Sequence, residues 1–236
     1  MTWVKICGIT NLEDALTAVD AGADAVGFVF YEKSPRKIDA HTAREIVENL
    51  PESVEKVGVF AGSSIEHALE TGRRVGFDAL QLYPMTNLKS AADGTSTERA
   101  TGATGMKIYL ALPITLFLGA ASKTLAGFSQ PHPAGVPNTL VLDSGNSQQP
   151  GGTGKVFDWH EASDVVDDLS RHQKIVIAGG LTARNVAEAM DILHPWGVDV
   201  ASGVEANLGK KDAQKVRAFV RAVRAIDQNT MDRETS

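Results

Sequence analysis

Two residues of this 236-residue chain have side chains suited to proton transfer, and each lies where a short apolar run ends. Cys7, the only cysteine, follows residues 4–6 and precedes a glycine. Asp143 ends the run 139–143. A thiol and a carboxyl group can serve as base and acid when their surroundings tune both pKa values. The two residues therefore predict acid–base chemistry, provided that the fold brings the two run ends together.

Eight apolar runs of this kind alternate with segments of helical periodicity. Such alternation predicts a parallel sheet. Eight units in a chain of this length favour a closed (β/α)₈ TIM barrel, and an open doubly wound sheet is the alternative. The runs cover residues 4–9, 25–31, 56–61, 79–83, 106–112, 139–143, 174–178 and 198–201.

No linker divides the chain, so we predict one α/β domain, a single (β/α)₈ barrel over residues 1–227. The polar residues 228–236 are predicted to form a disordered C-terminal tail. The alternation weakens between residues 84 and 138, and residues 90–105 are rich in Ala, Gly, Ser and Thr without a periodic apolar face. We therefore expect irregular fourth and fifth βα units.

Strand periodicity predicts which side chains face the barrel interior. Successive residues of a strand point to opposite faces. If the apolar neighbours pack under the helices, Lys5 and Cys7 face inward, and so do Val141 and Asp143. Active sites of such barrels lie at the C-terminal ends of the strands. Strands one and six lie on different sides of a barrel, so the thiol and the carboxyl group would face each other across its mouth.

Both residues also have structural interpretations. A lone cysteine is often a small buried apolar residue. Against this, Cys7 lies at a strand end, and the inward-facing Lys5 would lower the thiol pKa from its ordinary value of about 8.5. Asp143 would equally suit an N-cap of the loop that follows it, and strand periodicity does not decide between the two interpretations.

Two glycine-containing turns follow the seventh and eighth runs. Gly179-Gly180 and Ser202-Gly203 lie where barrels of this kind often bind phosphate through backbone N–H groups. Glycine lets the main chain approach a ligand closely. Tight turns are the structural alternative. Two such turns on the expected pair of strands favour phosphate binding.

Other motifs point away from nucleotide and metal sites. Residues 151–155 read Gly-Gly-Thr-Gly-Lys, but Val156 stands where a phosphate-binding P-loop needs Ser or Thr, so we expect a mobile loop beside the site. The six histidines show no metal-ligand spacing.

Arg36 is either a solvated surface charge or a carboxylate clamp, because a guanidinium group binds carboxylates in bidentate fashion.

Composition narrows the function classes. The net charge of −6 argues against a broad nucleic-acid surface. No apolar run approaches the roughly 20 residues of a membrane helix, and no signal peptide is indicated at the N-terminus. One cysteine excludes an intrachain disulfide and suits a reducing compartment, so we expect a cytoplasmic protein.

Nine segments of the chain resemble the sequences of the phosphoribosylanthranilate isomerase family. The similarity runs in order from the first strand to the last helix and fades between residues 84 and 138. The opening motif and the segment from Asp143 to Trp159 are specific when taken together. The matching segments are Lys5-Ile6-Cys7-Gly8-Ile9-Thr10, Gly27-Phe28-Val29-Phe30, Ser34-Pro35-Arg36, Val57-Gly58-Val59-Phe60, Gln81-Leu82, Leu142-Asp143-Ser144, Gly151 to Gly154 with Phe157-Asp158-Trp159, Ala178 to Leu181, and Gly197 to Glu205.

The resemblance implies a TIM-barrel enzyme of tryptophan biosynthesis. Its reaction is an Amadori rearrangement of N-(5′-phosphoribosyl)anthranilate to 1-(2-carboxyphenylamino)-1-deoxyribulose 5-phosphate. No metal and no organic cofactor are implied. The expected partner is the small phosphorylated substrate, with neither nucleic acid nor membrane. A monomer is the default expectation and a dimer is the alternative.

The resemblance also assigns roles. Asp143 becomes the general acid that protonates the ribose ring oxygen, and Cys7 the general base that removes the C2′ proton. Arg36 would hold the anthranilate carboxylate, and Asp199 would contact the substrate. Backbone groups of Gly179, Gly180, Ser202 and Gly203 would hold the phosphate. These roles predict a raised pKa for Asp143 and a lowered pKa for Cys7.

The sequence departs from the family pattern at Tyr83-Pro84, where His-Gly is usual, and at Ala201, where Ser is common. Two other functions remain alternatives. Cys7 and Arg36 argue against a related phosphate-binding barrel such as indole-glycerol-phosphate synthase. The presence of Cys7, Arg36 and Asp143 argues against a barrel without catalytic activity that only binds a ligand or a partner.

Overall fold

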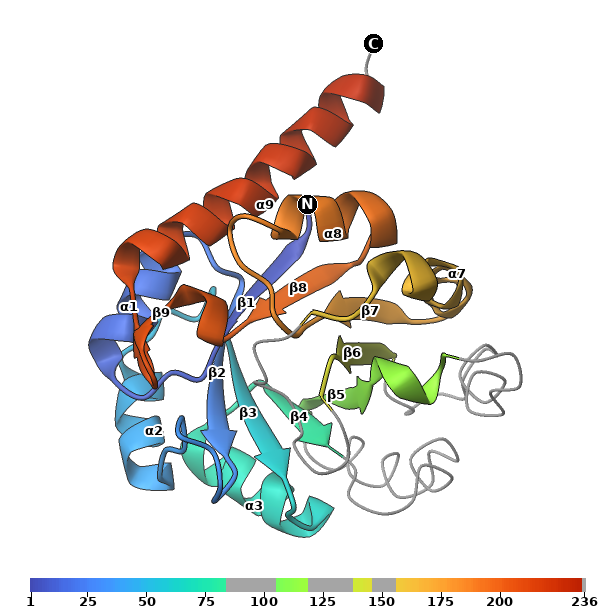
Figure 1. Cartoon of the computed structure of the whole chain (residues 1–236). Helices are drawn as coiled ribbons and strands as arrows, with labels where there is room; N and C mark the ends of the chain where they lie inside the picture. Colours follow the sequence, from blue (N-terminus) through green and yellow to red (C-terminus); the bar gives the residue numbers. More distant parts are fainter. Residues whose placement is uncertain (84–104, 119–137, 146–155, 235–236) are drawn as a thin grey trace.

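The computed structural model describes residues 1–83, 105–118, 138–145 and 156–234. Within them, eight parallel strands pair in chain order and form a closed barrel (Figure 1). Strand β1 pairs with β8, and this pairing rules out the open sheet. The predicted (β/α)₈ barrel is confirmed. Its strands are β1 (Trp3–Cys7), β2 (Ala25–Phe30), β3 (Glu55–Ala61), β4 (Ala79–Tyr83), β5 (Lys107–Pro113), β6 (Thr139–Asp143), β7 (Lys174–Ile177) and β8 (Gly197–Val200).

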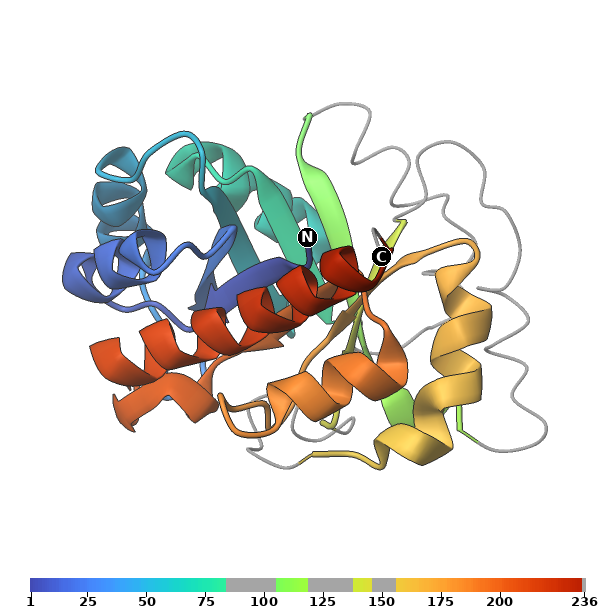
Figure 2. The ribbon, with the colours of Figure 1, turned by 90° about the horizontal axis from the view of Figure 1, so that it is seen from above.

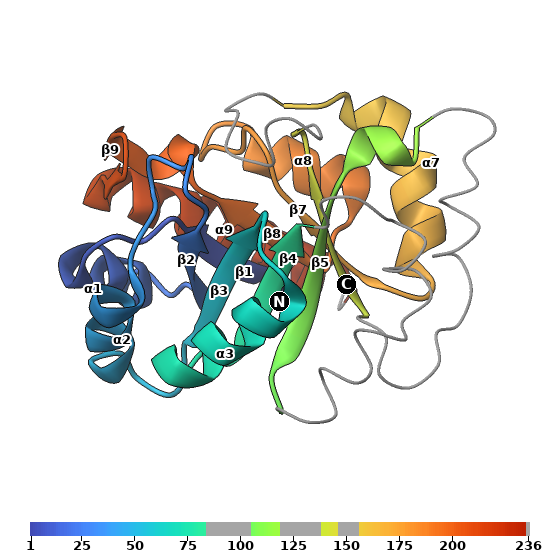
Figure 3. The same ribbon diagram turned by 90° about the horizontal axis from the view of Figure 1, so that it is seen from below.

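Helices surround the barrel. Seen from below, α1, α2 and α3 lie along one side and α7 and α8 along the other (Figure 3). The last helix, α9, contacts both α1 and α8 and so joins these two groups of helices (Figure 2). The helices are α1 (Leu12–Asp20), α2 (Ala40–Glu48), α3 (Ile65–Val75), α7 (Trp159–Ser170), α8 (Val186–Leu193) and α9 (Ala213–Glu234).

Local sequence explains where several helices begin. The side chains of Asn11, Asp39, Ser64 and Asp158 each accept a hydrogen bond from a backbone N–H of the first turn of α1, α2, α3 and α7 respectively. Such caps satisfy donors that a helix N-terminus leaves without partners. These caps fix the residue at which each of the four helices begins.

The strands separate two apolar layers, as their periodicity predicted. Val4 and Ile6 are fully buried between strand and helices, whereas Cys7 belongs to the cluster inside the barrel. Lys5 also faces inward and lies beside Asp199 in the β1–β8 pairing. The apolar residues that fill the barrel interior are mainly Ala and Val.

Aromatic rings close the N-terminal end of the barrel. Trp3 stacks on Trp196 with ring centroids 5.3 Å apart and meets Tyr109 edge to face at 5.8 Å. The ammonium group of Lys174 lies 4.5 Å from the Trp196 ring centroid. We call this end the floor, and we call the opposite end, where the strands finish, the mouth.

The C-terminal segment corrects one prediction. Residues 228–234 were expected to be disordered, but α9 continues to Glu234, and its last turns extend past the barrel (Figure 1). Gln228 donates a hydrogen bond to Asp232 one turn later. The physical reason is that polar composition does not end a helix when neither Gly nor Pro interrupts it.

Two further predictions concern residues outside the described ranges. The fourth and fifth βα units were expected to be irregular, and most of the segments after β4 and β5 lie there. The described part of the fifth unit consists of β5 and a short 3₁₀ helix, Ile114–Leu116. The loop at residues 151–155 also lies outside. Among the described residues, no helix is both long and apolar enough to cross a bilayer.

Candidate active site

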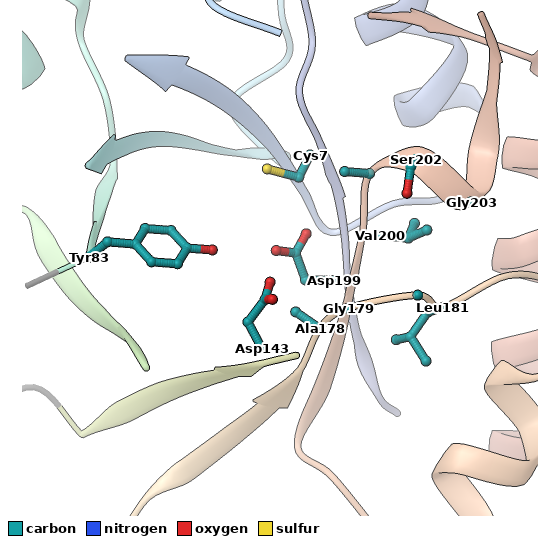
Figure 4. Close-up of a pocket in the computed structure, with 12 residues that line it drawn as sticks. Cys7, Tyr83, Asp143, Ala178, Gly179, Leu181, Asp199, Val200, Ser202 and Gly203 are labelled. Atoms are coloured by element: carbon teal, nitrogen blue, oxygen red, sulfur yellow. The ribbon is translucent and has the colours of Figure 1, made fainter. Parts of the chain in front are cut away.

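The mouth of the barrel contains a pocket where the predicted site residues meet. Figure 4 shows the side chains of Cys7, Asp143, Asp199 and Tyr83 pointing toward one another. They come from the ends of β1, β6, β8 and β4. The prediction that Cys7 and Asp143 face each other across the mouth agrees with this geometry. The remaining lining residues are Ala178, Gly179, Gly180, Leu181, Val200, Ala201, Ser202 and Gly203.

A buried ammonium group lies beneath this pocket. Lys5 is 1% exposed, and its Nζ donates to Asp199 Oδ2 at 2.6 Å and to Gln81 Oε1 at 2.9 Å. Burial opposes the charge of Lys5, but the charges of Asp199 and Cys7 outweigh burial and raise its pKa. Lys5 therefore stays protonated inside the barrel, paired with a carboxylate.

The pKa of Cys7 is raised, whereas the sequence predicted a lowered pKa. Burial raises the pKa of the thiol above its ordinary value, although Lys5 acts to lower it. The prediction rested on the charge of Lys5, but Lys5 is paired with the carboxylate of Asp199, which itself acts to raise the thiol pKa. In the free protein Cys7 is consequently a protonated thiol at neutral pH.

Asp143 behaves as predicted. Burial raises the pKa of its carboxyl group from 3.8 to about 6, with a further contribution from the charge of Asp199. The N–H of Gly145 donates to Asp143 Oδ1 at 2.6 Å and acts in the opposite direction. Asp143 is therefore much more readily protonated near neutral pH than an exposed carboxyl group.

Asp199 retains one oxygen without a partner. Its Oδ2 binds Lys5, whereas Oδ1 is buried and accepts no hydrogen bond among the described residues. An unpaired buried carboxylate oxygen is costly, and such atoms often mark ligand positions. Because Asp199 lines the pocket, Oδ1 is placed to accept a hydrogen bond from a bound hydroxyl group.

The two glycine turns form one wall of the pocket. Gly179 and Gly180 have φ angles of 90° and 66°, in the left-handed region that side chains disfavour. A Cβ atom on Gly203 would collide with the carbonyl oxygen of Leu181, so the two turns pack directly against each other. The backbone N–H of Gly180 donates to none of the described residues. This wall has the features expected of an anion site.

Arg36 does not line the pocket. Its guanidinium group makes a buried bidentate pair with Glu205, Nε to Oε1 at 2.7 Å and Nη2 to Oε2 at 2.8 Å. This hydrogen bonding raises the pKa of Arg36, and it lowers the pKa of Glu205 against the effect of burial. Gly8, with a φ angle of 78°, leaves room for the Arg36 chain. Of the two alternatives, the solvated surface charge is wrong, because Arg36 is buried and holds a carboxylate that belongs to the protein.

Lys211 is a buried side chain that links the end of β1 to the residue after β8. Its Nζ donates to the carbonyl oxygens of Cys7 at 2.6 Å and Ala201 at 3.1 Å, and lies 3.2 Å from Glu205 Oε1. Burial lowers its pKa, although Glu205 opposes this. Sequence reasoning missed Lys211 and Glu205. The only signal in the sequence was the segment from Gly197 to Glu205 that resembles the family. Glu205 ends this segment, and Lys211 follows it.

Gln81 and Tyr83 were also missed as site residues. Both face inward from β4, and strand periodicity alone would have placed them there. Gln81 Nε2 donates to the Tyr83 hydroxyl oxygen at 3.4 Å. Among the described residues, no three His, Cys, Asp or Glu side chains gather in a way that could hold a metal ion.

Comparisons with known proteins agree with the geometry. The family profile for N-(5′phosphoribosyl)anthranilate (PRA) isomerase matches residues 4–92 and 130–222. An N-(5′-phosphoribosyl)anthranilate isomerase from Pelobacter propionicus is 39% identical over 221 residues, covering 94% of this chain and 95% of its own.

Solved structures show the same likeness. The crystal structure of phosphoribosyl anthranilate isomerase from Thermotoga maritima has a TM-score of 0.76 and 34% identity, covering 95% of this chain and 100% of its own. A second isomerase structure, in complex with reduced 1-(o-carboxyphenylamino)-1-deoxyribulose 5-phosphate, has a TM-score of 0.73, 34% identity and the same coverage. The chain therefore belongs to the N-(5′-phosphoribosyl)anthranilate isomerase family.

Proposed function

We propose that this chain converts N-(5′-phosphoribosyl)anthranilate to 1-(2-carboxyphenylamino)-1-deoxyribulose 5-phosphate by general acid–base catalysis. The observation that supports this most is the placement of Cys7 and Asp143 in one pocket, next to the wall formed by the two glycine turns. The reaction needs an acid and a base on different sides of a sugar, and a site for the phosphate that the sugar carries.

The first step is assigned to Asp143. Its protonated carboxyl group donates a proton to the ribose ring oxygen, the C1′–O bond breaks, and the nitrogen lone pair forms the C1′=N bond of an iminium. The raised pKa of about 6 keeps part of this carboxyl group protonated at neutral pH. A positioned acid of this kind contributes roughly 10²–10⁴-fold to a rate.

The second step is assigned to Cys7. The active base is the fraction of Cys7 that has released its thiol proton to solvent. This thiolate removes the C2′ proton, and the electron pair forms a C1′=C2′ bond while the nitrogen becomes neutral. The resulting enolamine then tautomerises to the ketone. The buried ammonium group of Lys5 acts to lower the thiol pKa, so it stabilises the thiolate when it forms. Cys7 acts here as a base and forms no covalent bond to the substrate.

Binding is assigned to the surrounding groups. The N–H groups of Gly179, Gly180, Ser202 and Gly203 hold the phosphate. The free Oδ1 of Asp199 accepts a hydrogen bond from a sugar hydroxyl group. These contacts fix the sugar between acid and base, so that both proton transfers occur within one bound geometry.

Arg36 can bind the anthranilate carboxylate without leaving Glu205. Its Nε and Nη2 atoms are bonded to Glu205, whereas Nη1 makes no hydrogen bond to any described residue. We assign Nη1 to the substrate. Glu205 then serves to orient the guanidinium group.

Both steps are proton transfers, so the proposal includes no metal and no organic cofactor. It also includes a cytoplasmic location, because the chemistry requires Cys7 as a free thiol. The partner is the small phosphorylated substrate.

Complementation tests the proposed function. The wild-type gene should restore growth of a tryptophan auxotroph that lacks this isomerase, and Cys7→Ala and Asp143→Asn should not. In purified form each substitution should lower kcat by roughly 10²–10⁴-fold, because each removes one proton transfer.

Soluble expression and unfolding curves of all three proteins serve as the control. A soluble, folded wild type that neither complements nor isomerises the substrate would overturn the proposal. Full activity of either variant would overturn the role assigned to that residue.

A further inference from the structure

Tyr83 presents a phenolic hydroxyl group that neither the acid, the base nor the binding groups account for. It is the last residue of β4, and its ring extends into the pocket with the hydroxyl directed toward Cys7, Asp143 and Asp199 (Figure 4). None of the described residues accepts a hydrogen bond from it. The phenolic proton is therefore available to a bound molecule.

A chain of hydrogen bonds fixes the direction of this proton. Lys5 has only donors, so it donates to Asp199 on one side and to Gln81 Oε1 on the other. The amide of Gln81 must then turn its Nε2 toward Tyr83, where it donates to the hydroxyl oxygen. Because Tyr83 accepts from Gln81, its own proton points away from Gln81.

The electrostatics of the pocket keep that proton in place. Burial raises the pKa of Tyr83 well above its ordinary value, and the charges of Asp143, Asp199 and Cys7 act in the same direction. The hydroxyl thus remains a neutral donor throughout the pH range in which the enzyme would work. It can stabilise negative charge on an acceptor without exchanging its proton.

The oxygen atoms of the substrate identify the acceptor, and this step rests on the proposed function. The ring oxygen receives a proton from Asp143, the phosphate lies against the glycine turns, and the anthranilate carboxylate belongs to Arg36. Asp199 Oδ1 is an acceptor and so takes a hydroxyl that donates. The oxygens on C2′ and C3′ remain, and of these only the oxygen on C2′ changes its bonding, because it becomes the ketone oxygen after the C2′ proton leaves.

We propose that Tyr83 is a further catalytic residue, which donates a hydrogen bond to the oxygen on C2′ during enolamine formation and tautomerisation. The barrel geometry agrees with this position. Strand β4 lies across the mouth from β8, so Tyr83 faces the part of the sugar that lies away from the phosphate. Gln81 and Lys5 act through Tyr83 by fixing the direction of its proton.

Three variants test the role of Tyr83 in the wild-type background. Tyr83→Phe removes only the hydroxyl group, and Tyr83→His replaces it with an N–H donor. Tyr109→Phe removes a phenolic hydroxyl at the floor, where it binds Glu55. Steady-state kinetics on N-(5′-phosphoribosyl)anthranilate should show kcat reduced about 10- to 100-fold in Tyr83→Phe, somewhat below the effect of removing a donor to a full oxyanion. KM should change little, because the contact strengthens as the reaction proceeds.

The other variants separate donation from shape. Tyr83→His should recover part of the lost kcat, and Tyr109→Phe should keep wild-type kcat. Unfolding curves show whether Tyr83→Phe is folded, and its large loss of kcat at unchanged stability would support the proposal. Wild-type kcat in Tyr83→Phe, or equal losses in Tyr83→Phe and Tyr83→His, would overturn it while leaving the proposed function intact. An inactive wild type would overturn both.

Discussion

The two ends of the barrel contain the same kinds of polar side chain in opposite states of hydrogen bonding. At the floor, Tyr109 donates to Glu55 at 2.7 Å and Lys107 donates to the same carboxylate at 2.6 Å. At the mouth, the Tyr83 hydroxyl donates to none of the residues that the structure describes. The carboxylate of Asp199 is bound to Lys5 through one oxygen only.

This difference indicates which end was built for a ligand. The hydroxyl and carboxylate groups at the floor satisfy one another. The groups at the mouth are buried without being fully satisfied, which costs stability. Such a loss of folding free energy is typical of a binding site, because the bound ligand supplies the missing hydrogen-bond partners. Unused donors and acceptors, more than residue type, distinguish the site from the floor.

The largest expected difference between the two ends is the loss of stability when a lysine is replaced. Lys5→Met removes the partner of a buried carboxylate and should lower the free energy of unfolding by about 3–5 kcal/mol. Lys107→Met breaks a pair whose lysine side chain is 67% exposed, and it should cost at most about 1 kcal/mol. Urea unfolding of both variants measures this, provided that the m-values agree. Similar losses for the two variants would show that Asp199 is not a buried, dependent charge.

The lysine comparison also shows what the sequence could predict. The inward direction of Lys5, Cys7 and Asp143 followed from strand periodicity, which is a local property of the chain. The barrel followed from the count of alternating runs. The tail at residues 228–234 was wrongly predicted, because polarity alone does not distinguish a helix extending into solvent from disorder.

The partners of the buried charges could not be predicted. Lys5 and Asp199 are separated by 194 residues, and Arg36 and Glu205 by 169. No local pattern contains information about such pairs, because the closure of the barrel brings them together. The direction of the Cys7 pKa was wrong because it depends first on how deeply the closed barrel buries the thiol, and then on the charges around it.

The next largest difference is the effect on stability of replacing a carboxyl group at each end. A rise in the pKa of Asp143 from 3.8 to about 6 corresponds to about 3 kcal/mol. The folded protein then holds this proton more tightly than the unfolded chain, so stability falls as pH rises from about 4 to about 6 and stays lower above that range. Asp143→Asn removes this loss. It should be more stable than the wild type by up to about 3 kcal/mol at neutral pH and nearly equal to it at about pH 4.

Glu55→Gln is the matched variant at the floor. It weakens the bonds to Lys107 and Tyr109, so it should destabilise the protein by about 1 kcal/mol at neutral pH. Thermal unfolding across the pH range measures both variants. If Asp143→Asn proved no more stable than the wild type at neutral pH, the carboxyl group would not be held in an unfavourable ionised state.

The smallest effect concerns Asp199 and the thiol. The Asp199 carboxylate raises the pKa of Cys7 by its own charge and by pairing with Lys5. Asp199→Asn removes that charge and leaves the charge of Lys5 in place, so the thiol pKa should fall. Because the chain has one cysteine, the ultraviolet absorbance of the thiolate against pH reports this group directly, with Cys7→Ala as the blank that cancels the tyrosines. Glu55→Gln, at the other end of the barrel, should leave the thiol pKa unchanged. An unchanged thiol pKa in Asp199→Asn would mean that burial alone sets it, and the base would then depend on the substrate for activation.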